Sequence, residues 1–147
     1  KDSLTRVAQE FSTLGHGHPH AMAELAPQYE AMGIEVVRES AEVFDRADSL
    51  CFDASSIGYE FASLGRPVVV LNAPWYRRDV NFGLRFWDHA DVGVNVDEPE
   101  ELIAGINSAL ADWPDQRTKR EAAVRASYEF TDGRCAQRAA AAILEVL

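Results

Sequence analysis

The sequence predicts an α/β fold, a Rossmann-like parallel sheet with helices on both faces, in a single domain over residues 1–147. Three observations lead to this prediction. Short apolar runs alternate with helical patterns along the chain. The Val-rich run at residues 67–71 is typical of a strand buried on both faces. Polar turns follow the strands, at the edge of a parallel sheet where ligands bind.

The first half of the chain alternates helices with short strands. Gly and Pro interrupt the run Gly-His-Gly-His-Pro-His and predict a loop at a strand end. Pro27 is expected to divide the helix that contains it, and Gly33 to end that helix. The predicted elements are a helix over 4–11, a loop over 15–20, a helix over 21–32, a strand over 34–37 and a helix over 41–47.

The second half continues the same alternation. Gly65 is expected to close one helix, and acidic residues with Pro99 signal the start of another. Residues 72–91 form an aromatic-rich connection, which fits a face between domains. The predicted elements are strands over 48–52, 67–71 and 92–96 and helices over 57–64, 102–110, 117–128 and 135–147.

Composition restricts the class of protein. The formal net charge of −10 argues against a general binder of nucleic acid or of membrane surfaces, but not against a nucleotide ligand. Cys51 and Cys135 are expected to be free thiols in a reducing compartment, and we expect a cytoplasmic protein. Neither the cysteine spacing nor any long apolar run indicates a metal site, a signal peptide or a membrane span.

The strongest candidate site is the turn between the strand at 48–52 and the next helix. Asp53, Ser55 and Ser56 stand where hydroxyl and backbone N–H groups can bind a phosphate, although the two serines are equally suited to capping the helix. Glu60 lies one helical turn further and can face the same ligand. Its carboxylate suits a ribose or glycerol diol, and the alternative is a solvated helix face.

Two further segments are expected at the same edge of the sheet. His16, His18 and His20 could form a metal site, a catalytic or phosphate-contacting imidazole, or a polar surface loop, and His18 is the best single candidate. Arg77 and Arg78 could clamp a phosphate or form surface salt bridges. His89 stands alone and is interpreted as a structural residue.

Together these motifs resemble a known family. The order is His18-Pro19, the turn Asp53-Ala-Ser-Ser, an acid-containing helix, Leu-Gly-Arg-Pro and a Val-rich strand. It resembles the C-terminal half of CDP-glycerol glycerophosphotransferases, which build teichoic-acid-type polymers on a GT-B scaffold. Asp132-Gly-Arg134 with Arg138 is similar to that family's closing segment, so the resemblance covers residues 14–147. Ala54 replaces an aromatic residue common in the family's turn, and the loop at 72–78 also departs from its pattern.

The resemblance implies roles for the candidate residues. His18 matches the family's motif histidine near the donor phosphates and is the expected catalytic residue. Asp53, Ser55 and Ser56 match the phosphate-binding turn, to which Arg77 would add a guanidinium, and Glu60 matches the acidic helix position. The implied ligand is a nucleotide-diphosphate donor, CDP-glycerol or a UDP-sugar, with no cofactor and no metal.

The chain opens on a helical pattern without Met, whereas an α/β domain normally opens on a strand. We therefore expect a fragment of a two-domain GT-B enzyme whose N-terminal half holds the acceptor and whose full-length form associates peripherally with membranes. Such a fragment would bind its donor weakly and would not turn over. The alternatives are a UDP-N-acetylglucosamine 2-epimerase-like domain, which shares this layout, and a non-catalytic α/β binding module, against which the missing first strand argues.

Overall fold

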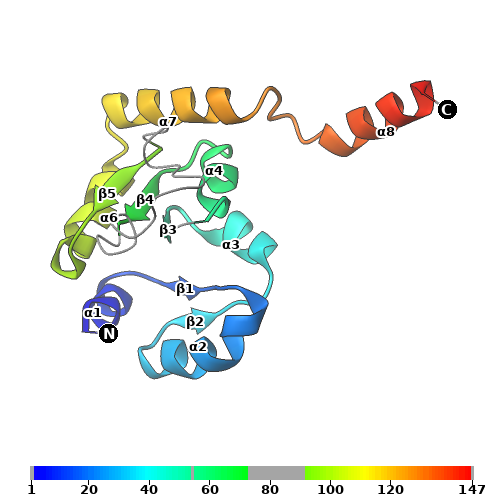
Figure 1. Cartoon of the computed structure of the whole chain (residues 1–147). Helices are drawn as coiled ribbons and strands as arrows, with labels where there is room; N and C mark the ends of the chain where they lie inside the picture. The colour runs from blue at the N-terminus through cyan, green and yellow to red at the C-terminus, as the bar shows by residue number, and fades with distance from the viewer. Residues whose placement is uncertain (1, 54, 73–91, 147) are drawn as a thin grey trace, which may run out of the picture.

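The computed structural model describes residues 2–53, 55–72 and 92–146 (Figure 1). Its helices and strands alternate, as predicted. In chain order they are α1 (Asp2–Glu10), β1 (Leu14–Gly15), α2 (Pro19–Ala31), β2 (Glu35–Val36), α3 (Ser40–Arg46), β3 (Leu50–Phe52), α4 (Ile57–Ala62), β4 (Val68–Leu71), β5 (Val94–Val96), the 3-10 helix η2 (Pro99–Glu101), α6 (Leu102–Ala111), α7 (Pro114–Ser127) and α8 (Cys135–Glu145). No helix among the described ranges is both long and apolar enough to cross a membrane.

All of the described strand pairs are parallel, which confirms the α/β class. β4 is central in a three-stranded sheet of order β3-β4-β5, and β1 pairs with β2 in a second sheet. The described strands therefore form two small sheets, where the sequence led us to expect one. The two sheets are separate because no backbone hydrogen bonds join β1 to β3 among the described residues.

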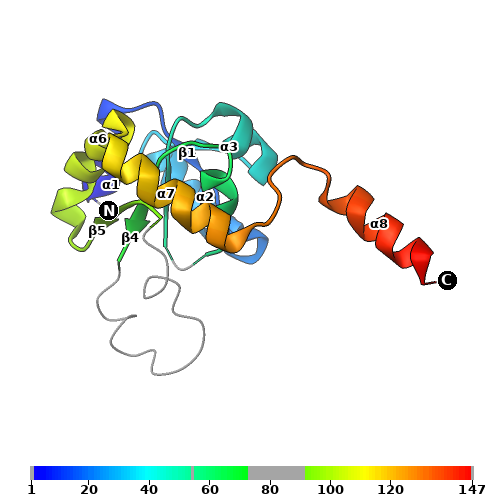
Figure 2. The same ribbon diagram turned by 90° about the horizontal axis from the view of Figure 1, so that it is seen from above.

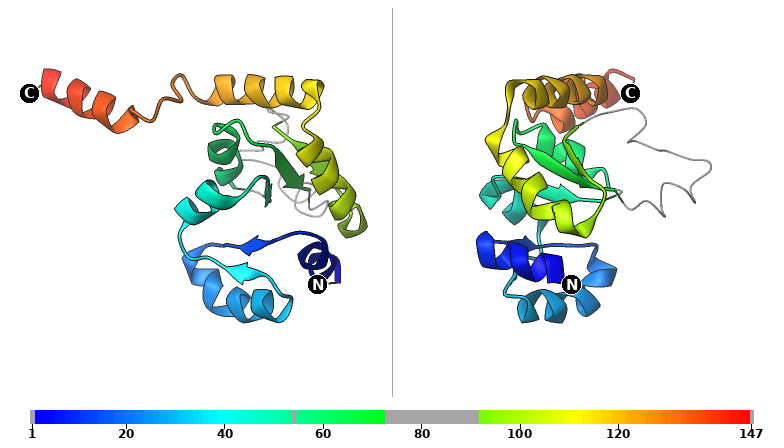
Figure 3. Two further views of the ribbon diagram at one scale, coloured as in Figure 1. Left: turned by 180° about the vertical axis from the view of Figure 1, so that it is seen from behind. Right: turned by 90° about the vertical axis from the view of Figure 1, so that its left-hand side faces the viewer.

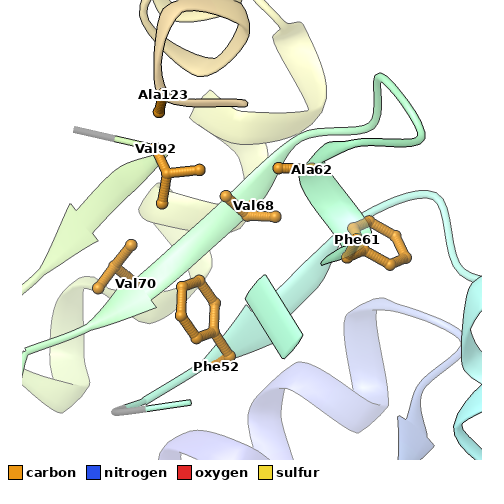
Figure 4. Packing of buried hydrophobic residues seen from close by; sticks show 7 residues of the cluster. All are labelled: Phe52, Phe61, Ala62, Val68, Val70, Val92 and Ala123. Carbon is orange, nitrogen blue, oxygen red and sulfur yellow. The ribbon is translucent and has the colours of Figure 1, made fainter. Parts of the chain in front are cut away.

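Helices cover both faces of the three-stranded sheet because successive side chains of β4 point in opposite directions. Val68 and Val70 pack with residues of α4 and α7 in one cluster, whose members Figure 4 shows. Val69 faces the opposite side, where Val7 of α1 and Ile106 of α6 complete a second cluster. All three valines of β4 are at most 5% exposed, as expected of a strand with helices on both sides.

Several predicted helix bounds differ from those of the structure, and the differences in α2 and α7 involve proline. Pro27 does not divide α2, which runs unbroken from Pro19 to Ala31. Proline removes one hydrogen bond of a helix but does not prevent neighbouring turns from forming, and α2 also gains a proline at its first position. α7 begins at Pro114 and not at residue 117, because proline is also favoured at the first position of that helix.

The carboxyl ends of the strands define one edge of the molecule. Figure 2 shows the start of α2, which follows β1, on the same side as the ends of β3 and β4. α8 extends away from the sheets, as Figures 1 and 3 show, and contributes no residue to either core cluster. Any site built from the strand ends is therefore remote from α8.

Candidate functional site

The turn between β3 and α4 is held in place by close packing beneath it. Phe52, the last residue of β3, is 5% exposed, and its ring lies directly against Gly58 in the first turn of α4. A Cβ at Gly58 would overlap that ring, so only glycine lets the helix approach the strand this closely. Asp53 and Ser56 are exposed, and Ser55 is partly exposed. The packing therefore presents the polar turn at the strand edge.

Two hydrogen bonds connect described residues of the turn. The N–H of Ser55 donates to the carbonyl of Asp53 at 2.7 Å, and the N–H of Ile57 donates to Oγ of Ser55 at 3.4 Å. Ser56 makes no side-chain capping bond, and its Oγ donates instead to the carboxylate of Glu60 at 3.4 Å. Helix capping therefore accounts for Ser55 only weakly and for Ser56 not at all. The Ser55 hydroxyl accepts in its bond with Ile57, so it can donate its proton to a ligand, whereas Ser56 would exchange its 3.4 Å bond to Glu60 for one to the ligand.

Ser56 and Glu60 lie on the same face of α4, as the sequence spacing predicted. However, α4 spans six residues, not the eight expected, so its dipole adds little positive charge at the turn. An anion bound here would depend on the hydroxyls of Ser55 and Ser56 more than on the helix.

The histidine loop follows β1 and starts α2. Nδ1 of His18 accepts a hydrogen bond from the N–H of His20 at 3.4 Å, and the two rings stack with centroids 5.1 Å apart. A neutral His18 therefore carries its proton on Nε2. His16 is tied to β2 through a 3.2 Å contact between its Nδ1 and the carbonyl of Val37. His18 and His20 are exposed, whereas His16 is half-buried, so His18 and its stacked neighbour His20 are the histidines accessible to a ligand.

Tyr29 of α2 packs against the start of the histidine loop, and the sequence analysis missed it. Its ring covers Gly15, where a Cβ would come within 2.6 Å of Tyr29 Cδ2. Burial raises the pKa of Tyr29, and the negative charge of Asp53 raises it further. Nothing in the sequence around Tyr29 predicted its contact with Gly15.

Asn72, directly after β4, is a second residue whose role the sequence did not reveal. It is 7% exposed, and its Nδ2 donates to Asn95 Oδ1 at 3.0 Å and to Asp97 Oδ1 at 2.9 Å. The Asn72 N–H also donates to the carbonyl of Val96 at 2.8 Å. These bonds fix the ends of β4 and β5 to each other, which makes the edge next to the turn rigid.

Arg66, in the Leu-Gly-Arg-Pro motif, has a structural role. Its Nη1 donates to the carbonyls of Phe44 at 2.5 Å and Ala47 at 2.8 Å, and its guanidinium lies over the ring of Phe61. These carbonyls lie at the end of α3, so Arg66 connects the start of β4 with the helix before β3.

Some of the predicted site residues lie outside the described residues. They are Ala54, Arg77, Arg78, His89 and the aromatic residues of the connection at 72–91.

A cavity of about 250 Å³ lies at the other end of α4, against α7. Three arginines line it, but Arg117 and Arg120 bind Asp112 at 2.8 Å, and Arg125 pairs with Glu121 at 3.6 Å. Because acidic partners balance these charges, the cavity is a poor phosphate site. The turn at β3 remains the better candidate.

Comparison with known proteins gives a family but no individual relative. The family model described as CDP-Glycerol:Poly(glycerophosphate) glycerophosphotransferase matches residues 5–145. Searches of the curated proteins and of the solved structures found no match. The family match includes the histidine loop, the turn at β3 and the closing segment with Asp132 and Arg138.

Proposed function

The chain belongs to the CDP-glycerol:poly(glycerophosphate) glycerophosphotransferase family, and from this membership we propose that it is the donor-binding domain of such a transferase. The proposed donor is CDP-glycerol, bound at the carboxyl edge of the sheets. The observation that carries the proposal is the turn at β3, where Ser55 and Ser56 keep hydroxyls available at the edge at which α/β proteins bind nucleotides. The membership also favours this function over the epimerase-like alternative.

The proposed reaction is displacement at phosphorus. A terminal hydroxyl of the poly(glycerophosphate) acceptor attacks the β-phosphorus of CDP-glycerol and forms a new P–O bond. The bond from that phosphorus to the bridging oxygen breaks, CMP leaves, and the hydroxyl proton passes to a base. Negative charge builds up on the bridging oxygen, so hydrogen-bond donors beside it lower the barrier.

The candidate residues supply groups for this step. The hydroxyls of Ser55 and Ser56 donate to the phosphate oxygens, and the carbonyl of Asp53 holds the turn through the Ser55 N–H. His18 presents Nε2–H to the leaving phosphate as an acid or electrostatic partner. Glu60 accepts hydrogen bonds from the ribose or glycerol diol.

Two further parts of the proposal concern the whole enzyme. Arg77 would add a guanidinium to the phosphates. A second GT-B domain would bind the acceptor and supply the base, with the full-length enzyme at the membrane periphery. The isolated chain is therefore expected to bind donor weakly without transferring it, and robust glycerophosphate transfer by this chain alone would contradict the two-domain proposal.

Calorimetric titration with CDP-glycerol, CDP, UDP-N-acetylglucosamine and UDP tests the site. We expect saturable binding of the cytidine ligands, weakened at least about tenfold in Ser55→Ala/Ser56→Ala because two hydrogen bonds to charged oxygens are lost. The matched control is Ser127→Ala, whose Oγ donates to the Ala123 carbonyl within α7. Equal affinity in the double variant and the control would refute the role of the turn.

A further inference from the structure

Asn72 holds two exposed polar side chains in place at the carboxyl edge of the three-stranded sheet. Its Nδ2 carries two hydrogens, which allows one bond to Asn95 Oδ1 at 3.0 Å and one to Asp97 Oδ1 at 2.9 Å. Asn72 is 7% exposed, whereas Asn95 and Asp97 are both exposed. The backbone N–H of Asn72 already joins the ends of β4 and β5. The buried amide therefore does more than join two strands, because it fixes the positions of two groups that a ligand can reach.

Asn95 and Asp97 lie on the face of the sheet that α4 covers. Asn95 is the register partner of Val70, which packs with residues of α4 (Figure 4). Val96, between Asn95 and Asp97, points to the opposite face and belongs to the cluster with α6. The turn at β3 leads into α4 at the same carboxyl edge. The two exposed groups therefore share both the edge and the face of the candidate site.

The spacing of the strands sets the distance between the turn at β3 and the end of β5. Neighbouring strands are about 4.8 Å apart, so the ends of β3 and β5, with β4 between them, are separated by about 10 Å. A diphosphate ester has a substituent at each end. When its phosphates lie at the turn, the substituent that is directed along the edge past β4 comes to Asn95 and Asp97.

The chemistry of the two groups fits a pair of hydroxyls. The carboxylate of Asp97 accepts hydrogen bonds, and Nδ2 of Asn95 donates them. Nδ2 of Asn95 now donates to the Gly93 carbonyl at 3.4 Å, a long bond that a ligand can replace. Of two adjacent hydroxyls, one can donate to the carboxylate while the other accepts from the amide. A carboxylate repels phosphate, so this place suits a neutral end of the donor and not its diphosphate.

We propose, as a refinement that rests on the proposed function, that Asp97 and Asn95 recognise the glyceryl group of CDP-glycerol. Asp97 accepts a hydrogen bond from one glyceryl hydroxyl, Asn95 donates to the other, and Asn72 positions both side chains. Glu60 is then left to bind the ribose diol. Selectivity for the transferred group thus comes from the end of β5, and affinity for the nucleotide from the turn at β3.

The variant Asp97→Asn tests this assignment. Asparagine keeps an oxygen for the bond from Asn72 and replaces the other oxygen by an NH₂ group, so an acceptor becomes a donor at nearly constant shape. Calorimetry measures the affinities for CDP-glycerol, for CDP and for the propyl ester of CDP, which lacks the two hydroxyls. We expect the wild type to prefer CDP-glycerol to the propyl ester. Asp97→Asn should lower only the affinity for CDP-glycerol, by about tenfold, because a hydrogen bond to a charged acceptor is lost.

The matched control is Asp115→Asn, which changes an exposed carboxylate in the first turn of α7. It should bind all three ligands like the wild type, and circular dichroism verifies that both variants fold. NMR spectra of the side-chain amides give a readout at the place itself. CDP-glycerol should shift the Nδ2 resonances of Asn95, and the propyl ester should not.

Three results would overturn the proposal. They are equal affinities of the wild type for CDP-glycerol and the propyl ester, an equal loss of affinity for all three ligands in Asp97→Asn, and no loss in that variant. Each of them leaves the nucleotide site standing, because the binding of CDP and its loss in Ser55→Ala/Ser56→Ala test that site separately. If the wild type binds none of the three ligands, the proposed function fails and this inference fails with it.

Discussion

Gly58 controls the geometry of the turn at β3. Replacing it by Ala adds a methyl group against the ring of Phe52, which lies in the core. Alanine favours a helix by about 1 kcal/mol, but overpacking costs about 1–3 kcal/mol. We expect Gly58→Ala to lower the free energy of unfolding in urea and to weaken nucleotide binding.

The control for Gly58 is Gly17→Ala. A Cβ at Gly17 meets only the flexible side-chain ends of Leu25 and Met22, both at 3.3 Å. This variant should keep its stability close to that of the wild type. If Gly58→Ala is as stable as the control, the close packing of Phe52 against Gly58 does not determine the geometry of the turn.

Asp112 and Arg120 form the most buried ion pair among the described residues. Arg120 is 3% exposed and donates to Asp112 at 2.8 Å. The hydrogen bond from Arg120, followed by that from Arg117, lowers the pKa of Asp112 below its usual 3.8. The stability that this pair contributes is therefore complete above pH 3.8 and is lost as the pH falls from there through the folded-state pKa.

We expect Asp112→Asn to cost about 2–3 kcal/mol at pH 7, because it leaves a buried guanidinium without its carboxylate. Thermal melts at pH 7 and pH 3 measure the effect. The difference between wild type and variant should shrink at the lower pH. A constant difference would mean that the charge of Asp112 is not the cause.

At the scale of elements, Arg66 joins α3 to the start of β4. Arg66→Ala should lower the free energy of unfolding by about 1–3 kcal/mol, since two carbonyls at the end of α3 lose their donor. The affinity for CDP-glycerol should not change, because Arg66 lies outside the candidate site. Arg46→Ala, which removes an exposed pair with Glu35, is the control. A lost affinity at normal stability would instead place Arg66 in the site.

The elements themselves could be predicted to a large extent. β4 was recognisable because Val68, Val69 and Val70 form a continuous apolar run. Pro99 and its acidic neighbours marked the helical turn η2, which leads into α6. The division into two sheets could not be predicted, since periodicity gives the existence of a strand and not its partners.

The candidate site was only partly predictable. Asp53, Ser55 and Ser56 follow a strand directly, and such positions are visible in a sequence. Tyr29 and Asn72 take their roles from contacts with Gly15 and Asn95, which are distant in the chain. No local pattern contains that information.

At the scale of the whole molecule, α8 is an appendage. Its residues Ile143 and Leu144 are 59% and 72% exposed, Val146 directly after it is 84% exposed, and none of them belongs to a core cluster. A chain that ends after Thr131 should therefore keep its melting temperature within about 2–4 °C, the effect of roughly 1 kcal/mol in a domain of this size. A much larger fall in melting temperature would mean that α8 packs against the other elements in solution.

β4 also has a consequence for the order of folding. β4 pairs with both β3 and β5, and its side chains belong to both core clusters. Neither cluster can therefore form before β4 has formed. The rate-limiting nucleus should therefore form around β4. Val69→Ala is expected to slow refolding in stopped-flow experiments, with a φ-value of about 0.5–0.8. Val7→Ala, which removes a contact made by α1 in the same cluster, should instead speed unfolding.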